Sequence, residues 1–219
     1  RLLFKRPKLR KRTSNFITML LRQFEIEAKR AGYQLIAGVD EAGRGPLAGP
    51  VVSAACIILD DSSLNEIRDS KKLSPKKRER LYQELIQSDT IDFGIGIVGP
   101  ERIDEINILQ AALESMRLAV SDLNLNPDYL LIDGNQSIGM DIADQPVVKG
   151  DSLELSIAVA SVIAKVKRDE LMMGLDRAHP EYGFASHMGY PTKRHVEALE
   201  KHGPIEAHRK SFKPVASLL

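Results

Sequence analysis

Two adjacent carboxylates, Asp40 and Glu41, follow the apolar run 35–39 and precede the glycine-rich stretch 42–46. The composition of residues 34–39 predicts a strand of the core. Burying like charges side by side is unfavourable unless cations pair with them. Divalent metal ions would meet this need, and Mg²⁺ binds a few carboxylates together with substrate phosphates. The chain must therefore fold so that one strand of the core ends at a candidate metal site.

Apolar periodicity elsewhere predicts a mixed α/β fold. The predicted strands are residues 34–39, 50–59, 91–98 and 129–133, with a short strand around 146–149. The predicted helices are residues 14–31, 75–87, 100–123, 156–173 and 192–202, with Ser74 and Thr192 as the N-caps of the second and the last. The short link through the glycine-rich stretch indicates that the first two strands are antiparallel neighbours. This order of elements is typical of a layered domain in which helices cover a mixed sheet.

The composition places the chain among globular proteins that have no membrane contact. Its 219 residues suffice for one domain with a full core. No run reaches the roughly 18 consecutive apolar residues of a membrane span, and no apolar segment follows the basic start as in a secretory signal. The single Cys56 cannot form an internal disulfide, which fits a reducing compartment. We expect a cytoplasmic monomer.

The first twelve residues hold seven basic residues and no acid. The remaining residues, 13–219, then hold 24 basic and 30 acidic residues, a formal charge of −6 before histidines are counted. Three interpretations of this basic arm stay open. It could contact nucleic-acid phosphates, remain a solvated tail, or begin a helix attached to the domain.

Two further acids stand near the ends of other predicted strands. Asp133 closes the strand 129–133, and Asp151 follows the last short strand after a glycine. If the first and fourth strands are neighbours, Asp40 and Asp133 meet at one edge of the sheet. Neighbouring strand residues point to opposite faces, so we expect the chain to turn directly after Asp40 to bring Glu41 in. Taken alone, each strand-end aspartate could instead serve a turn.

The loop Gly43-Arg44-Gly45 offers backbone amides and one guanidinium to a closely approaching group. A dinucleotide-binding fingerprint is the rival interpretation of these glycines. It fails because that fingerprint opens a helix, whereas the proline and the β-branched residues that follow predict a strand. Two acids directly before the loop would also repel a pyrophosphate.

Other polar residues have two interpretations each. Lys71 could bind a phosphate or be a solvated loop charge. Tyr190 could stack on a sugar or base or pack within its loop. The histidines show no metal-ligand spacing with cysteine, which argues against a zinc site.

Taken together, the motifs resemble bacterial ribonuclease HII over nearly all of the chain after residue 33. The segments that carry the resemblance are GVDEAGRGPLAGPVV (38–52), DSKKLS (69–74), LIDGN (131–135), VVKGD (147–151), SIAVASVIAKVKRD (156–169), GYPTKRH (189–195) and HRKSFKPV (208–215). The chain departs from the family's frequent pattern at Met188, where lysine is common, and at Pro191, where glycine is common.

This resemblance implies a ribonuclease H-like fold with a small C-terminal helical subdomain. It implies a metal-dependent endonuclease that cuts the RNA strand of RNA–DNA hybrids and duplex DNA containing single ribonucleotides, as in ribonucleotide excision repair. Cleavage on the 5′ side of the ribonucleotide by two-metal-ion hydrolysis would leave 3′-hydroxyl and 5′-phosphate ends. The cofactor would be Mn²⁺ or Mg²⁺.

The resemblance also implies roles for individual residues. The family's catalytic and metal-binding acids fall on Asp40, Glu41, Asp133 and Asp151. Its substrate-binding groups fall on the remaining matched positions, Gly43, Arg44, Gly45, Lys71 and Tyr190. We divide the chain into a basic arm with an N-terminal helix, 1–32, and a catalytic domain, 33–219, which includes a C-terminal helical region from about 175 to 219. The alternatives are a catalytically idle nucleic-acid-binding module and another metal nuclease of the same fold, such as a resolvase or a ribonuclease HIII.

Overall fold

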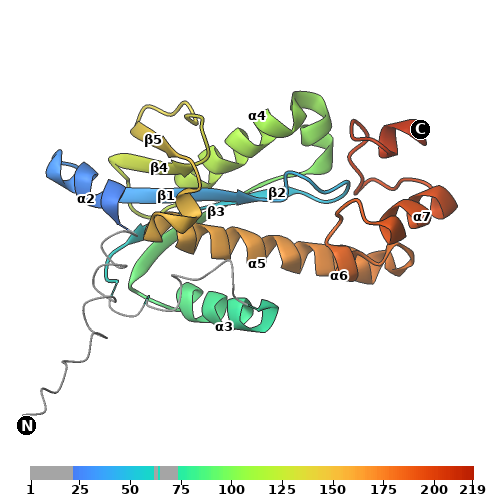
Figure 1. Cartoon of the computed structure of the whole chain (residues 1–219), viewed down its shortest axis with the longest axis horizontal. Coiled ribbons are helices and arrows are strands. Elements are labelled where there is room, and N and C mark those ends of the chain that lie inside the picture. The colour runs from blue at the N-terminus through green and yellow to red at the C-terminus, as the bar shows by residue number, and fades with distance from the viewer. Residues whose placement is uncertain (1–21, 62–63, 65–73) are drawn as a thin grey trace, which may run out of the picture.

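The computed structural model of the protein describes residues 22–61, 64 and 74–219. Five strands form one sheet in the order β3-β2-β1-β4-β5 (Figure 1). β2 runs antiparallel to both β1 and β3, whereas β1, β4 and β5 are parallel to one another. The strands are β1 (Ile36–Ala42), β2 (Val51–Ile58), β3 (Ile91–Val98), β4 (Tyr129–Asp133) and β5 (Ala143–Val147). The predicted mixed sheet is confirmed.

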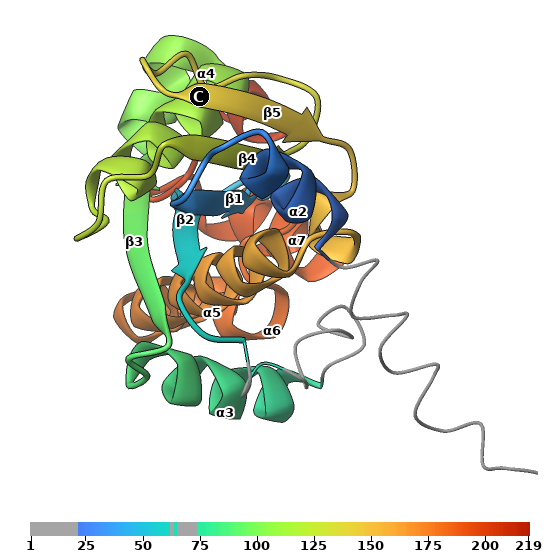
Figure 2. The same ribbon diagram turned by 90° about the vertical axis from the view of Figure 1, so that its left-hand side faces the viewer.

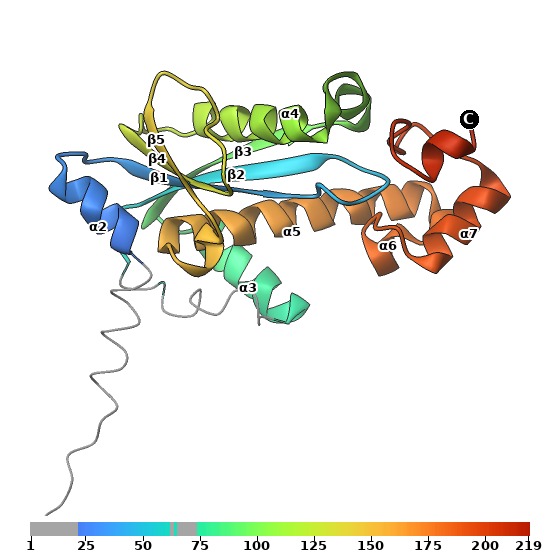
Figure 3. The same ribbon diagram turned by 45° about the horizontal axis from the view of Figure 1, so that its top comes forward.

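Helices cover both faces of this sheet. α4 (Pro100–Ser121) packs on one face against β1, β2 and β3, and α5 (Leu155–Ala178) packs on the other against β1 and β2. α3 (Pro75–Ile86) packs on α5 and forms an outer layer (Figure 3). α2 (Gln23–Arg30) lies beside the end of the sheet where β1 begins. Within the described residues, no helix is both long and apolar enough to cross a bilayer.

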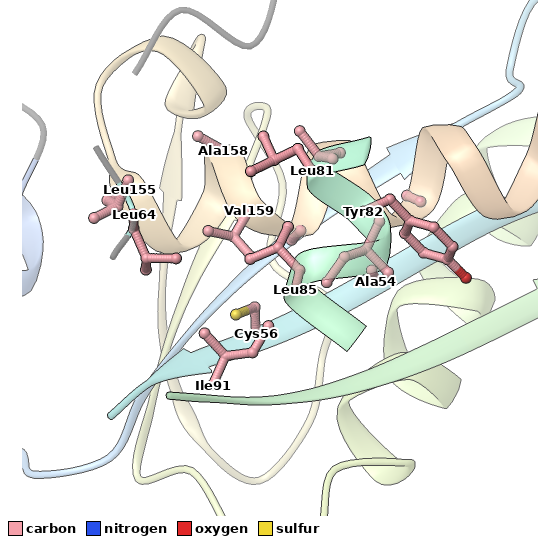
Figure 4. Packing of buried hydrophobic residues seen from close by; sticks show 14 of the residues in the cluster. Ala54, Cys56, Leu64, Leu81, Tyr82, Leu85, Ile91, Leu155, Ala158 and Val159 are labelled. Atoms are coloured by element: carbon pink, nitrogen blue, oxygen red, sulfur yellow. The ribbon is translucent and has the colours of Figure 1, made fainter. Parts of the chain in front are cut away.

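The strand residues divide between the two faces as a period of two requires. Ala37 and Val39 of β1 belong to the core beneath α4, together with Met116 and Val120. On the other face, Cys56 packs beneath α3 and α5, as a buried free thiol (Figure 4). The end-on view of Figure 2 shows the sheet, strongly twisted, between these helices.

Gly38 brings α5 unusually close to β1. A Cβ atom at this position would overlap the backbone of Ser156 and Ile157 in the first turn of α5. Glycine is therefore required for steric reasons, because any side chain would push the helix away from the strand. Asp40 lies two positions further along β1 and faces the same helix, so the close approach also brings α5 near this carboxylate.

The chain after α5 forms a small helical region at one end of the sheet. Its elements are η3 (Pro180–Tyr182), α6 (Phe184–His187), α7 (Lys193–His202) and η4 (Val215–Ser217). This region has its own apolar cluster, which also takes in Leu47 and Ala48 from the connection between β1 and β2. The loop that follows β1 is thereby packed into the C-terminal region.

Helix caps agree with their sequence signals, whereas some boundaries differ. Ser74 accepts from the backbone of Lys77, and Thr192 accepts from the backbone of His195, as predicted for N-caps. The predicted single helix 100–123 is interrupted at Asn107, which has a φ of 67°. Of the predicted helix 14–31, residues 14–21 lie outside the described part of the chain.

Two strand predictions were wrong in position. β5 occupies Ala143–Val147 and not the region around 146–149. β1 does not end before the acids but runs on to Ala42, so Asp40 and Glu41 are both strand residues. The turn expected directly after Asp40 lies instead at Gly43, which has a φ of +102°. Pairing with Ala54 and Ser53 of β2 keeps the backbone extended through both acids.

Candidate active site

Three acids from two neighbouring strands meet at one edge of the sheet. Val39 of β1 pairs with Ile132 of β4, so the next residues, Asp40 and Asp133, lie level with each other. One carboxylate oxygen each from Asp40, Glu41 and Asp133 lies within 4.8 Å of the other two. The structure thus brings together three of the four predicted acids.

Asp40 is the most deeply placed of the three, with 5% of its surface exposed. Its Oδ1 accepts a hydrogen bond from the backbone N–H of Glu41 at 2.7 Å, and the side chain of Ser161 on α5 also hydrogen-bonds to it. Burial, followed by the charges of Glu41 and Asp133, raises the pKa of Asp40 well above its ordinary value. A nearby cation would offset both effects, because it favours the charged form of the carboxyl group.

Glu41 has one paired oxygen and one unpaired oxygen. The guanidinium of Arg44 donates to Oε1 at 3.2 Å. Oε2 is buried and has no hydrogen-bond partner among the residues that the structure describes. Burial raises the pKa of Glu41, an effect that Arg44 partly offsets. A buried carboxylate oxygen without a partner is costly, and a divalent cation would satisfy it, so this donor set fits a hard metal ion.

Asp151, the fourth predicted acid, is not part of this three-residue group. Its carboxylate is not within 4.8 Å of all three acids. Asp151 lies in the short 3-10 helix η2 (Gly150–Ser152). The backbone N–H groups of Gly150 and Asp151 point at Oδ1 of Asp133, at 2.6 and 3.4 Å. The backbone of η2 therefore contacts the three-acid group through Asp133.

A cavity of about 340 Å³ adjoins these acids. Its walls are the end of β1 with Glu41, the loop Gly43–Gly45, one face of α5 and the ring of Tyr190. A Cβ atom at Gly45 would lie 3.6 Å from Cε1 of Tyr190, so the loop and the ring face each other across the cavity. The ring is 43% exposed and is open to a partner. The predicted loop and the predicted tyrosine therefore share one hollow beside the acids.

Sequence reasoning missed three residues on the α5 wall of this cavity: Ser161, Lys165 and Arg168. They recur at intervals of four and three residues, which places polar groups on one face of an otherwise buried helix. That spacing was the available signal. Lys165 also forms an ion pair with Asp169, one helical turn further along, at 2.6 Å.

A fourth missed residue, Arg209, lies behind the Gly43–Gly45 loop and is fully buried. Its guanidinium donates to the carbonyl oxygens of Gly43, Arg44 and Gly49. Its position in the motif HRKSFKPV gave no sign that the side chain would be buried. Lys71, a predicted phosphate contact, and the basic arm, for which nucleic-acid contact was one of three open interpretations, lie outside the described residues.

Among the residues that the structure describes, Asp40, Glu41 and Asp133 form the one group of potential metal ligands. His187, His195 and His208 are buried instead in the C-terminal region. His195 and His208 face each other, with their Nε2 atoms 3.1 Å apart.

Comparison with solved structures places the fold. The crystal structure of ribonuclease H2 from Pyrococcus horikoshii OT3 is 27% identical, with a TM-score of 0.70, over 84% of this chain and 97% of that chain. The structure of Bst-RNase HIII in complex with Mn²⁺ is 18% identical with a TM-score of 0.68, over 87% and 71% of the two chains, and shares the fold. The fold and the acidic site define a ribonuclease H-type endonuclease.

Sequence comparison identifies the family. The family model of ribonuclease HII matches residues 37–215. Ribonuclease HII of Clostridioides difficile (strain 630) is 52% identical over 86% of this chain and 74% of its own length. Ribonuclease HII of Chlamydia pneumoniae is 47% identical over 93% and 94%. The chain belongs to the ribonuclease HII family and is a metal-dependent endonuclease.

Proposed function

We propose that this protein hydrolyses the RNA strand of RNA–DNA hybrids and also cuts duplex DNA on the 5′ side of a single embedded ribonucleotide. The observation that carries the proposal is the adjacency of the three-acid group to the cavity between the Gly43–Gly45 loop and Tyr190. Glu41 belongs to both. A group that handles phosphate chemistry thus adjoins a hollow suited to a sugar and its base.

In the proposed reaction, a water oxygen attacks the phosphorus, the bond from phosphorus to the 3′ oxygen breaks, and that oxygen takes a proton. The products are a 3′-hydroxyl and a 5′-phosphate. Asp40, Glu41 and Asp133 would hold Mg²⁺ or Mn²⁺, with Asp151 proposed as a fourth acid because η2 contacts Asp133. Two such ions, when bound, would polarise the water and offset charge on the leaving oxygen.

Different parts of the cavity wall would recognise different parts of the substrate. The loop Gly43–Gly45 would read the ribose 2′-hydroxyl, the group that distinguishes RNA from DNA. Tyr190 would stack at the junction between RNA and DNA. Lys165 and Arg44 place cations beside the acids, where they would attract the phosphate backbone. Lys71 is proposed as a further phosphate contact on the family resemblance alone.

The decisive experiment is cleavage of a duplex that contains one ribonucleotide, with and without EDTA. We expect incision on the 5′ side, abolished by EDTA and reduced more than about a hundredfold by Asp133→Asn. Asparagine keeps an oxygen to accept from Gly150, so the variant should fold. Asp89→Asn, the same change in an exposed turn, is the control.

The same assay separates the alternative functions. Wild-type protein that cuts hybrids but spares the single ribonucleotide would favour a ribonuclease HIII-like activity, and binding without cleavage would favour an idle binding module.

We also propose that the protein acts as a monomer in the cytoplasm. The buried free thiol of Cys56 is compatible with a reducing compartment. Light scattering on the purified protein, with and without a bound duplex, tests the oligomeric state, and a mass twice that of one chain would contradict it.

A further inference from the structure

Arg209 is a fully buried cation, and burial of a charge is energetically costly. None of its surface is exposed, and burial together with the charge of Arg168 lowers its pKa. Removing a guanidinium from water is expensive unless its donors are all used. Here they are used on backbone oxygens: those of Arg44 at 3.0 Å, Gly43 at 2.6 Å and Gly49 at 2.9 Å.

These hydrogen bonds fix the orientation of two successive peptide groups. In a planar trans peptide, the carbonyl and the N–H point in opposite directions. The carbonyls of Gly43 and Arg44 point at the guanidinium, so the N–H groups of Arg44 and Gly45, which belong to the same two peptide units, point away from it.

The cavity lies on the side toward which these N–H groups point. Gly43, Arg44 and Gly45 line the cavity, whereas Arg209 lies behind them and is not part of its wall. Neither the N–H of Arg44 nor that of Gly45 has an acceptor within the described part of the chain. Two unused backbone donors therefore face the hollow beside the acids.

We propose that Arg209 is the positioning residue for sugar recognition: it turns the two backbone donors of Arg44 and Gly45 toward the 2′-oxygen of the ribonucleotide. The inference rests on the proposed function and names the part of the chain that fixes its selectivity. Arg209 does not touch the substrate. Its planar fork holds the two carbonyls in one fixed geometry, whereas a lysine ammonium is a point charge on a flexible stem and would not fix their direction.

Arg168 provides an internal comparison. It is equally buried and also binds three carbonyl oxygens, those of Ala48, Pro50 and Met188. None of these belongs to the two peptide groups that face the cavity. The two arginines thus support neighbouring segments, but only Arg209 sets the direction of the donors of Arg44 and Gly45.

The test measures selectivity and not activity alone. In an Asp133→Asn background with Mg²⁺, binding is measured to a duplex with one ribonucleotide and to the same duplex made only of DNA. We expect Arg209→Met to lower the preference for the ribonucleotide about tenfold or more, the effect of losing hydrogen bonds worth roughly 1.4 kcal/mol. Affinity for the all-DNA duplex should change less than about threefold.

Two further variants separate positioning from folding. Val120→Ala removes packing beneath α4 and should lower the melting temperature yet keep the preference. Arg209→Lys keeps the charge and should recover stability but not selectivity, so it decides the matter if Arg209→Met does not fold. A folded Arg209 variant with wild-type preference would overturn the inference. Absence of any ribonucleotide preference in the Asp133→Asn parent, together with no incision by the wild-type chain, would count instead against the proposed function.

Discussion

Gly43 and Gly45 stand in the same loop but lack side chains for different reasons. Gly43 has a φ of +102°, and a Cβ there would overlap the side chain of Arg168. Gly45 has no such restriction, because its Cβ would make only an ordinary contact, 3.6 Å from the ring of Tyr190. The protein itself requires the first glycine, whereas only a bound ligand would require the second.

This difference predicts opposite outcomes for two alanine substitutions. Gly43→Ala should lower the melting temperature by several degrees, since it forces both strain and a clash, at a cost of about 1–3 kcal/mol. Gly45→Ala should melt like the wild type but bind a one-ribonucleotide duplex at least about tenfold more weakly. Thermal denaturation and equilibrium binding check the pair. Normal binding by Gly45→Ala would show that the space beside Tyr190 is not used.

At the scale of elements, the C-terminal region holds the Tyr190 segment through a chain of imidazoles. The backbone N–H of Ile205 donates to Nδ1 of His208, so Nε2 of His208 carries the proton and donates to His195. Nδ1 of His195 then donates to the carbonyl of Tyr190 at 3.0 Å. Every link requires a neutral ring, because a second proton would place two N–H groups face to face.

Acid should therefore destabilise the protein. Burial lowers the pKa values of His187, His195 and His208, that of His208 to about 4. The unfolded chain takes up these protons near pH 6.5, so the free energy of unfolding should fall as the pH drops from about 6.5 towards 4.

We expect His208→Gln to melt lower than the wild type at pH 7.5 but to lose less stability on going to pH 5. His202→Gln, a change at an exposed histidine of α7, should leave the pH dependence as it is. Melting curves at the two pH values measure both effects. Parallel losses in the wild type and His208→Gln would contradict the assignment.

The elements also show what sequence reasoning can reach. Local signals sufficed for β3 and β4, whose bounds agree with the prediction, and for the caps Ser74 and Thr192.

The break in α4 was missed because apolar periodicity continues through it. Asn107 there has a positive φ of 67°, and its side chain accepts from the N–H groups of Leu109 and Gln110, which caps the restarted helix. β5 was misplaced since Pro146 suggests a strand start, although an edge strand tolerates proline.

For the site, residues with a local signature were predicted and residues defined by packing were not. Asp40, Glu41 and Asp133 stand at the ends of recognisable strands, and parallel pairing of β1 with β4 then brings them together. The burial of Arg209 depends on a contact across 166 positions with Gly43, which no local pattern encodes. The same holds for the placement of η2, where the backbone N–H of Gly150 donates to Asp133.

At the scale of the whole molecule, the acidic group links β1, β4 and η2, so a bound metal should stabilise the entire domain. Ligands that bind only the folded state add about 2.7 kcal/mol at a concentration one hundred times the dissociation constant. We expect Mg²⁺ or Mn²⁺ to raise the melting temperature by several degrees. Asp133→Asn should lose most of this increase, and sodium chloride at equal ionic strength should not produce it. An equal increase in Asp133→Asn would place the metal elsewhere.

β1 passes without interruption from the acids into the loop that lines the cavity, and a single residue, Ala42, separates Glu41 from Gly43. Under the proposed function, cutting and reading are therefore done by one rigid stretch of backbone with no hinge between them. The backbone between Glu41 and Gly43 then fixes the distance from the recognised ribose to the phosphodiester bond that is cut. Thermal motion of the C-terminal region can change the rate of cutting but not its position.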